Sequence, residues 1–315
     1  MSVTSVEGGP YAGADVAFTA GIYYTGPDPR VDASLLFAER ARDAGVPAVF
    51  VDGSPQKAPD AHPDWAPTWV ADAHRERGAV VLRAEVGGIA TQRQQGVKHL
   101  VEGGATKVVG VESEKPDVPL YVPELSAALD TADVLVIGRT PESLASMPPV
   151  QERTEHLAGW VLEQVHDLPP DTLAGPRGFS AAGAEVLGRY DATDTPEVKK
   201  NNWLYLYETP MTARQEGLAL GSVALGFKYP PKMVAQETGN PQFDGKRVDQ
   251  FDMQLAHLLN ESRVPQADNP QAVAATVRRT LAQFEGASLE TKMRLLEELS
   301  AQFGETHGYR PPVRR

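Results

Sequence analysis

Two glutamates placed two positions apart, Glu112 and Glu114, follow an apolar run and precede a short charged turn, KPD. Carboxylate oxygens are the ligands that hard cations such as Mg²⁺ and Mn²⁺ prefer. Two such groups leaving a strand can converge on one ion, whose other ligands would be diphosphate oxygens. The pattern therefore predicts a divalent metal site at Glu112 and Glu114, with an exposed charged turn as the structural alternative.

Two further motifs carry groups that suit a nucleotide. Asp52 ends the run PAVFVD, and its carboxylate can accept hydrogen bonds from a base or a ribose. Gly87 and Gly88 precede a helical segment bearing Arg93, so backbone amides and a cation can face a phosphate. The GxxxxGK[ST] pattern of a P-loop is absent. An Asp-Gly turn and a glycine lead-in to a helix are the structural alternatives.

Alternating apolar runs and helical segments position these residues, as in βαβ units that build a mostly parallel sheet. The strands are expected at 14–24, 47–54, 79–85, 106–114 and 133–139, with helices at 31–45, 69–77, 87–104 and 123–132. Asp52 then lies at the carboxyl edge of the sheet, where open α/β folds bind ligands. The predicted fold class is α/β, a single Rossmann-like, mostly parallel sheet flanked by helices.

The second half of the chain is predicted to be mainly helical. Helices are expected at 151–166 and 180–190, followed by three C-terminal helices within 250–304, the last of which starts at Ser288. The segment 228–247 is polar and interrupted by prolines, which predicts a loop that folds over a ligand. We expect a catalytic domain over 1–250 and a C-terminal helical extension over 251–315.

Composition narrows the function classes. The 315 residues include no cysteine, which excludes disulfides, thiolate zinc sites and cysteine nucleophiles. The net charge of -12 argues against broad binding to nucleic-acid phosphates. No apolar run reaches the roughly 18 residues of a membrane span, and the first residues lack the features of a signal peptide. We expect a cytoplasmic protein without a membrane span, whose terminal helices could form a homodimer.

Taken in chain order, these motifs resemble those of GT-A glycosyltransferases. VFVDGS resembles their VVDDGS stretch, GGIATQRQQGVKHL their glycine-led helix, and VESEKPD their metal-binding DxD turn. DVLVIGR is similar to their fifth strand, and LAGPRGFSAAGAEVL to the acceptor-side loop of polyprenyl-phosphate hexose synthases. NNWLYLYETPMTARQEGLAL resembles a segment of mannosylglycerate-synthase-like retaining enzymes, in which Glu208 takes the acidic position near the acceptor. A helix cap is the alternative role for Glu208.

The resemblance implies a nucleotide-diphosphate sugar as donor, Mn²⁺ or Mg²⁺ as cofactor, a small polar acceptor, and transfer with retention. The site residues it implies are Asp52 at the base, Gly87, Gly88 and Arg93 along the nucleotide, Glu112 and Glu114 at the metal, Arg177 at an acidic acceptor or at the leaving group, Glu208 at the acceptor, and Lys228, Lys232 and Lys246 or Arg247 closing over the diphosphate. Glutamates replace the family's aspartates, and GFKYPP lacks the histidine that retaining members often give to the metal. At these positions the chain departs from the family's metal-binding pattern.

Two other classes remain open from the sequence. A sugar-phosphate nucleotidyltransferase would share the sheet and the acidic site, although GIYYTGPDPR lacks its glycine- and arginine-rich first loop. A degenerate transferase that binds a nucleotide sugar without reacting is the second alternative. A dehydrogenase is disfavoured because GIYYTGPD supplies no GxGxxG at the first βα turn.

Overall fold

The computed structural model describes residues 9–24, 28–54, 67–85, 88–191, 203–260 and 262–310. The chain forms two compact units, each assembled from two separate segments. The first contains Met1–Gly138 and Gly175–Pro230, and the second contains Arg139–Ala174 and Pro231–Arg315. The domain boundary expected at residue 250 falls inside helix α10 (Pro241–Leu258).

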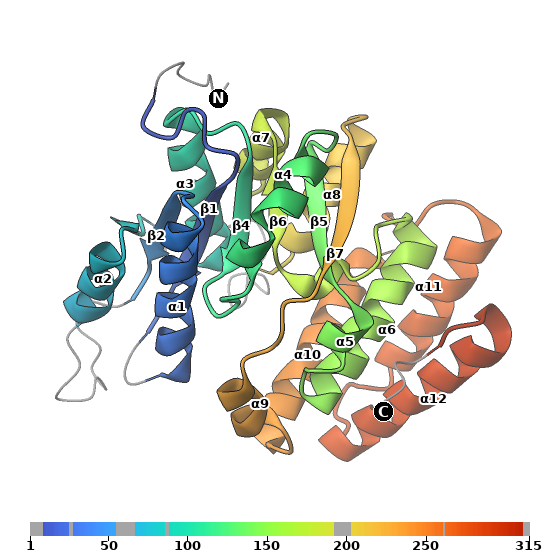
Figure 1. The fold of residues 1–315 in the computed structure, drawn as a ribbon. Coiled ribbons are helices and arrows are strands. Elements are labelled where there is room, and N and C mark those ends of the chain that lie inside the picture. Colours follow the sequence, from blue (N-terminus) through green and yellow to red (C-terminus); the bar gives the residue numbers. More distant parts are fainter. Residues whose placement is uncertain are drawn as a thin grey trace. The chain divides into compact units, whose positions relative to one another are not determined.

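The first unit is built on a seven-stranded sheet with the spatial order β3-β2-β1-β4-β6-β5-β7 (Figure 1). The strands are β1 (Ala17–Ile22), β2 (Ala48–Asp52), β3 (Val80–Arg83), β4 (Val108–Glu112), β5 (Val134–Arg139), β6 (Arg177–Phe179) and β7 (Leu220–Leu225). The strands β3, β2, β1 and β4 pair in parallel, whereas β6 runs antiparallel to β4 and β5. The predicted α/β class with a mostly parallel sheet is confirmed.

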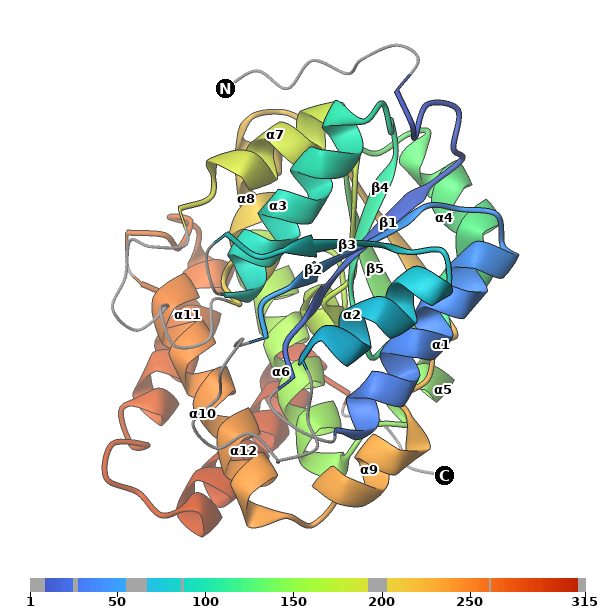
Figure 2. The ribbon, with the colours of Figure 1, turned by 90° about the vertical axis from the view of Figure 1, so that its left-hand side faces the viewer.

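Helices cover both faces of this sheet. Figure 2 shows α1 (Pro29–Asp43), α2 (Pro67–Glu76) and α4 (Val122–Leu129) on one face, and α3 (Ile89–Glu102), α7 (Ala181–Arg189) and α8 (Tyr205–Gln215) on the other. A short 3-10 turn, η1 (Val118–Tyr121), precedes α4. The five predicted strands are all present. The strands β6 and β7 were not predicted, since β6 is only three residues long and lies in a segment rich in glycine and proline.

A row of contacting rings forms the core under α1 and α2. The Phe37 ring meets Phe18 at 5.5 Å and Phe50 at 5.8 Å, both edge-to-face, and the Phe50 ring lies 4.3 Å from that of His74. Side chains alternate along a strand, so Phe18 and Phe50 face these helices while their neighbours face α3. His74 is fully buried, with Nδ1 hydrogen-bonded to the Val70 carbonyl oxygen at 2.7 Å.

The replacement His74→Phe is expected to flatten the acid side of the stability profile. Burial lowers the pKa of His74 below its ordinary value of 6.5, so below about pH 6.5 the unfolded chain binds more protons than the folded one. Stability is therefore lost as the pH falls, by up to about 1.4 kcal/mol per pH unit from this group. Urea unfolding of both proteins from pH 7.5 to 5.5 measures it, and equal slopes would contradict the buried neutral imidazole.

The second unit is mainly helical. Its helices are α5 (Pro141–Leu144), α6 (Pro149–His166), α9 (Pro231–Glu237), α10, α11 (Asp268–Leu281) and α12 (Leu289–His307), with a 3-10 turn η2 (Thr172–Ala174). Trp160 of α6 packs on Phe303 of α12 at 4.8 Å between ring centroids. Ser288 caps α12 as predicted, its hydroxyl accepting a hydrogen bond from the Thr291 amide.

The prediction of a loop over 228–247 is wrong for most of that segment. Pro231 is the first residue of α9 and Pro241 the first of α10, and Asn240 caps α10. Proline is well tolerated in the first turn of a helix, where its missing N–H has no intrahelical partner to lose. The prolines that suggested an irregular loop instead begin two helices.

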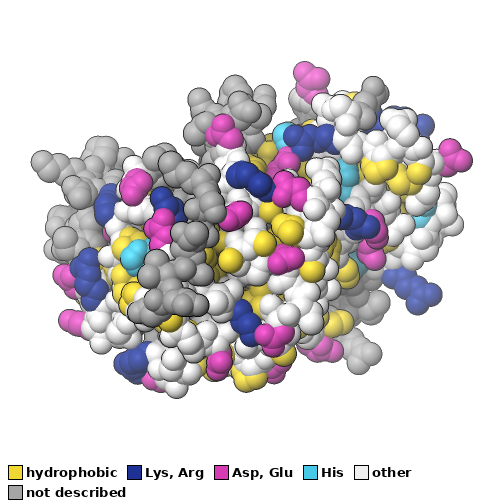
Figure 3. Space-filling view, turned by 90° about the horizontal axis from the view of Figure 1, so that it is seen from above, with side chains coloured by type: hydrophobic (Ala, Val, Ile, Leu, Met, Phe, Trp, Pro, Cys, Tyr) yellow, Lys and Arg dark blue, Asp and Glu magenta, His cyan; other side chains and the backbone are white. Residues whose placement is uncertain are grey.

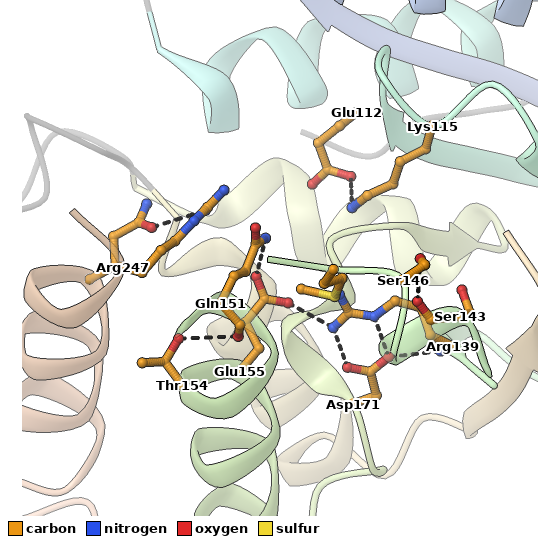
Figure 4. A network of polar contacts seen from close by, with 12 residues as sticks. Glu112, Lys115, Arg139, Ser143, Ser146, Gln151, Thr154, Glu155, Asp171 and Arg247 are labelled. Atoms are coloured by element: carbon orange, nitrogen blue, oxygen red, sulfur yellow. Dashed lines mark hydrogen bonds and ion pairs between the residues drawn. The ribbon is translucent and has the colours of Figure 1, made fainter. Parts of the chain in front are cut away.

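A saturated ionic network surrounds Arg139 in the second unit (Figure 4). Its guanidinium donates to Asp171 through Nε at 2.8 Å and to Glu155 through Nη2 at 2.7 Å. Gln151 in turn donates to Glu155 at 2.6 Å. Two carboxylates thus accept the hydrogen bonds of one buried cation, as a stable buried ion pair requires.

The surface drawn in Figure 3 carries Lys and Arg side chains interspersed with Asp and Glu. Within the described ranges, no helix combines the length and the apolar character needed to cross a bilayer.

Candidate functional site

The strand order of the first unit reverses between β1 and β4. From β1 the chain proceeds outward to β2 and β3, and then returns to the other side of β1 with β4. The parallel register pairs Gly21 with Glu112 and Ile22 with Asp52, so both predicted acids reach the same carboxyl edge. Ligands of open α/β sheets bind in the crevice at such a switch point.

Glu112, the last residue of β4, is only 5% exposed. Its side chain lies on the α3 face of the sheet, and its carboxylate accepts a hydrogen bond from Lys115 Nζ at 2.7 Å (Figure 4). Burial alone would raise the pKa of Glu112, but Lys115 and then Arg93 outweigh burial and lower it. Glu112 is therefore an ionised carboxylate held by cations of the chain itself.

Arg93 of α3 is a fully buried arginine with 1% exposure. The Arg93 side chain passes directly over Gly110 of β4. A Cβ atom at position 110 would overlap Arg93 Cδ, so the glycine makes room for the arginine. Its Cζ lies 5.8 Å from the centroid of the Tyr205 ring. Among the described residues, none of its three guanidinium nitrogens has a hydrogen-bond partner, nor does the Tyr205 hydroxyl.

A buried guanidinium without hydrogen bonds is costly, because no hydrogen bond offsets the desolvation of its donors. Arg139, which donates to two carboxylates, shows how this protein satisfies a structural buried arginine. Arg93 is at least as deeply buried and lacks these bonds. Unused buried donors of this kind are free to bond the oxygens of an anion.

Arg177 in β6 is opposite Gly110 in the antiparallel register and is fully buried. It donates to the carbonyl oxygens of Pro176 at 2.7 Å and Leu206 at 2.9 Å. The second bond ties β6 to the first turn of α8, which carries Tyr205. From the sequence, Arg177 was predicted to lie at the acceptor or at the leaving group, and the structure shows two of its donors bonded to backbone carbonyl oxygens.

These residues share one electrostatic environment. Burial raises the pKa of Tyr205 to about 12, and Arg93, Glu112 and Arg177 all act on its hydroxyl. We name Arg93, Glu112, Lys115, Arg177 and Tyr205 the Arg93 cluster. It holds three cations and one carboxylate, so positive charge is in excess. Such a site favours an anion with more than one negative charge.

Asp52 lies outside direct contact with this cluster. Its carboxylate accepts hydrogen bonds from the Ser54 amide at 2.8 Å and from Arg83 at 3.2 Å. Ser54 also accepts from the Tyr24 amide at 2.9 Å, and the Tyr24 hydroxyl meets the Ser113 hydroxyl at 3.3 Å. Tyr24 therefore links the turn after β2 to the turn after β4.

Glu114 and Glu112 are engaged by different cations. Glu112 is held by Lys115, whereas Glu114 contributes to raising the pKa of Arg30, behind the larger effect of the Asp28 hydrogen bond. Across the described part of the chain, no three His, Asp or Glu side chains form a group that could hold a metal ion. The arrangement does not fit a divalent ion shared by the two glutamates.

The other predicted site residues are dispersed. Gly88 is the N-cap of α3 with φ 124°, a conformation that favours glycine, while Gly87 falls outside the described residues. Glu208 is half-buried in the first turn of α8. Lys228 is exposed after β7, and its amide donates to Asp117 at 3.2 Å. The structure brings none of these three into the Arg93 cluster.

The remaining predicted cations belong to the second unit. Arg247 of α10 donates to Glu237 of α9 at 3.2 Å and to Gln250 at 3.2 Å. Lys232 lies on α9 and Lys246 on α10.

Sequence reasoning missed Lys115, Tyr205 and Tyr24 as site residues. Lys115 directly follows Glu112-Ser113-Glu114, and a cation beside two predicted metal ligands was a usable signal. Tyr205 and Tyr24 carried none, since an aromatic residue in an apolar run predicts core packing.

No protein-family model and no curated protein matches the chain. Two solved structures are similar to it at low identity. One is a putative nucleotide-diphospho-sugar transferase from Desulfovibrio desulfuricans, at TM-score 0.39 and 11% identity, covering 91% of this chain and 98% of that one. The other is S. aureus TarS, at TM-score 0.38 and 12% identity, covering 92% of this chain and 44% of that one.

Proposed function

We propose that this protein transfers a sugar from a nucleotide-diphosphate sugar to a small polar acceptor, with retention of anomeric configuration. The observation that carries the proposal is Arg93, a buried guanidinium without a hydrogen-bond partner among the described residues, at the switch point of the sheet. A guanidinium presents paired donors that match two phosphate oxygens. The excess positive charge of the Arg93 cluster suits a diphosphate better than a neutral ligand.

Different residues in and around the Arg93 cluster bind different parts of the donor. The turn of Asp52 and Ser54, tied to Ser113 through Tyr24, supplies polar groups for the base and ribose. Arg93 binds the diphosphate. The amide groups at the start of α3, next to Gly88, add the positive end of a helix dipole on the same side.

The acceptor is assigned to the first turn of α8. Glu208 lies there, and Arg177 holds that turn through its bond to the Leu206 carbonyl oxygen. In the transfer, the acceptor oxygen bonds to the anomeric carbon as the bond to the diphosphate oxygen breaks. The acceptor proton passes to Glu208, and retention requires the acceptor on the same face as the leaving diphosphate. Lys228, exposed after β7, is a candidate to close over the bound donor.

A transfer assay tests this function. The full chain is incubated with UDP-, GDP-, ADP- and dTDP-sugars and a panel of small polar acceptors, and released nucleoside diphosphate is measured. We expect nucleoside diphosphate to be released from one donor class, and one acceptor to stimulate the release. NMR of the product should show the same anomeric configuration as the donor. Glu208→Gln should lower kcat by about 100-fold if Glu208 is the base. Release from no donor would contradict the proposal.

A further inference from the structure

The positive charge beside Glu112 comes from the chain itself. Lys115 Nζ lies 2.7 Å from the Glu112 carboxylate and 5.9 Å from the centroid of the Phe227 ring. The backbone reinforces this arrangement, because the Lys115 amide donates to the Glu112 carbonyl oxygen at 3.1 Å. A tight turn thus returns the ammonium to the carboxylate at the end of β4.

A divalent ion at this position would meet unfavourable electrostatics. The buried carboxylate of Glu112 is already paired with the Lys115 ammonium and lies near the Arg93 guanidinium. Adding two positive charges to a cluster with an excess of cations is repulsive, whereas adding a diphosphate neutralises it. Glu114, the other predicted ligand, acts instead on Arg30 and Tyr24.

We propose that Lys115 and Arg93 together stabilise the leaving diphosphate, so that the transfer needs no divalent cation. The inference rests on the proposed function and concerns the same site. When the bond between the anomeric carbon and the diphosphate oxygen breaks, its electron pair remains on that oxygen. Lys115 and Arg93 offset the new negative charge and transfer no proton. Glu112 is a positioning residue, which holds the Lys115 ammonium at the edge of the sheet.

Calorimetric titration of the full chain with UDP, GDP, ADP and dTDP, in EDTA and in Mn²⁺, tests this proposal. We expect the tightest nucleotide to bind with the same Kd in both buffers, within about threefold. Lys115→Met should weaken its binding by about 30-fold, and Lys115→Arg, which keeps the charge, by only a few-fold. Lys98→Met is the matched control, because Lys98 is an exposed lysine paired with Glu102 on α3. It should leave the Kd unchanged.

Failure of this inference and failure of the proposed function give different results. Binding that requires Mn²⁺, or Lys115→Met binding as well as Lys98→Met, overturns the inference and keeps the transferase. Binding of no nucleotide in either buffer overturns both. If Lys115→Met does not fold, as judged by circular dichroism, the comparison of EDTA with Mn²⁺ on the unaltered protein decides.

Discussion

Replacing Arg93 with methionine is expected to weaken nucleotide binding by about 100-fold or more while leaving the folded protein at least as stable as before. Methionine fills similar space and carries no charge, so it removes three buried nitrogens that lack hydrogen-bond partners among the described residues. An unsatisfied buried polar group costs about 1–3 kcal/mol, and replacing buried charges with apolar groups is often neutral or stabilising. We expect the free energy of unfolding to rise by about 1 kcal/mol. Urea unfolding measures it.

Arg139→Met supplies the contrast. It also removes a buried guanidinium, but one that pairs with Asp171 and Glu155, and both carboxylates would lose their cation. Breaking such a buried network costs about 3–5 kcal/mol. Opposite signs for the two variants are the expected result. A comparable loss of stability in Arg93→Met would show that Arg93 holds the fold together and is not reserved for a ligand.

Gly175→Ala is expected to destabilise the protein by about 3 kcal/mol or more, through two effects at one position. Gly175 has φ +90°, in the region that alanine rarely adopts. A Cβ there would also overlap Glu112 Oε1, and Glu112 is buried and paired with Lys115. The clash therefore displaces the carboxylate as well as straining the backbone.

Gly217→Ala separates these two effects. Gly217 has φ +75°, and a Cβ there would meet no atom within 4 Å. Only the backbone strain remains, so we expect a loss of about 1 kcal/mol. Thermal and urea unfolding of both variants measure the difference. Equal losses would contradict the close approach of Gly175 to Glu112.

Much of the fold follows from local patterns. The runs around Phe18, Phe50 and Val109 are apolar and short, each ends in a turn, and each is followed by a helical segment, so period and length identify the first strands. Ser288 indicates the start of the last helix, because a serine hydroxyl can accept a hydrogen bond from an amide of the helix's first turn. The strand β6 could not be found this way, since Arg177–Phe179 is too short to show a period and depends on its neighbours β4 and β5.

The candidate site was predicted less completely, because its geometry depends on contacts distant in sequence. Arg93 and Glu112 were both selected, and the alternation of side chains along β4 puts Glu112 on the face that α3 covers. Their proximity depends on Gly110, and Gly110 reads as an ordinary strand residue. A metal ion and the Lys115 ammonium could each pair with Glu112 as judged from the sequence. Only the structure shows the ammonium 2.7 Å from the carboxylate.

In the proposed transfer, the buried guanidinium of Arg93 receives the diphosphate of a nucleotide sugar. The most direct measurement is a parallel calorimetric titration of wild-type protein and Arg93→Met with UDP, GDP, ADP and dTDP. We expect one nucleotide to bind the wild type, and its affinity for folded Arg93→Met to be lower by about 100-fold or more. Equal affinity for the two proteins, or binding of no nucleotide by the wild type, would contradict it.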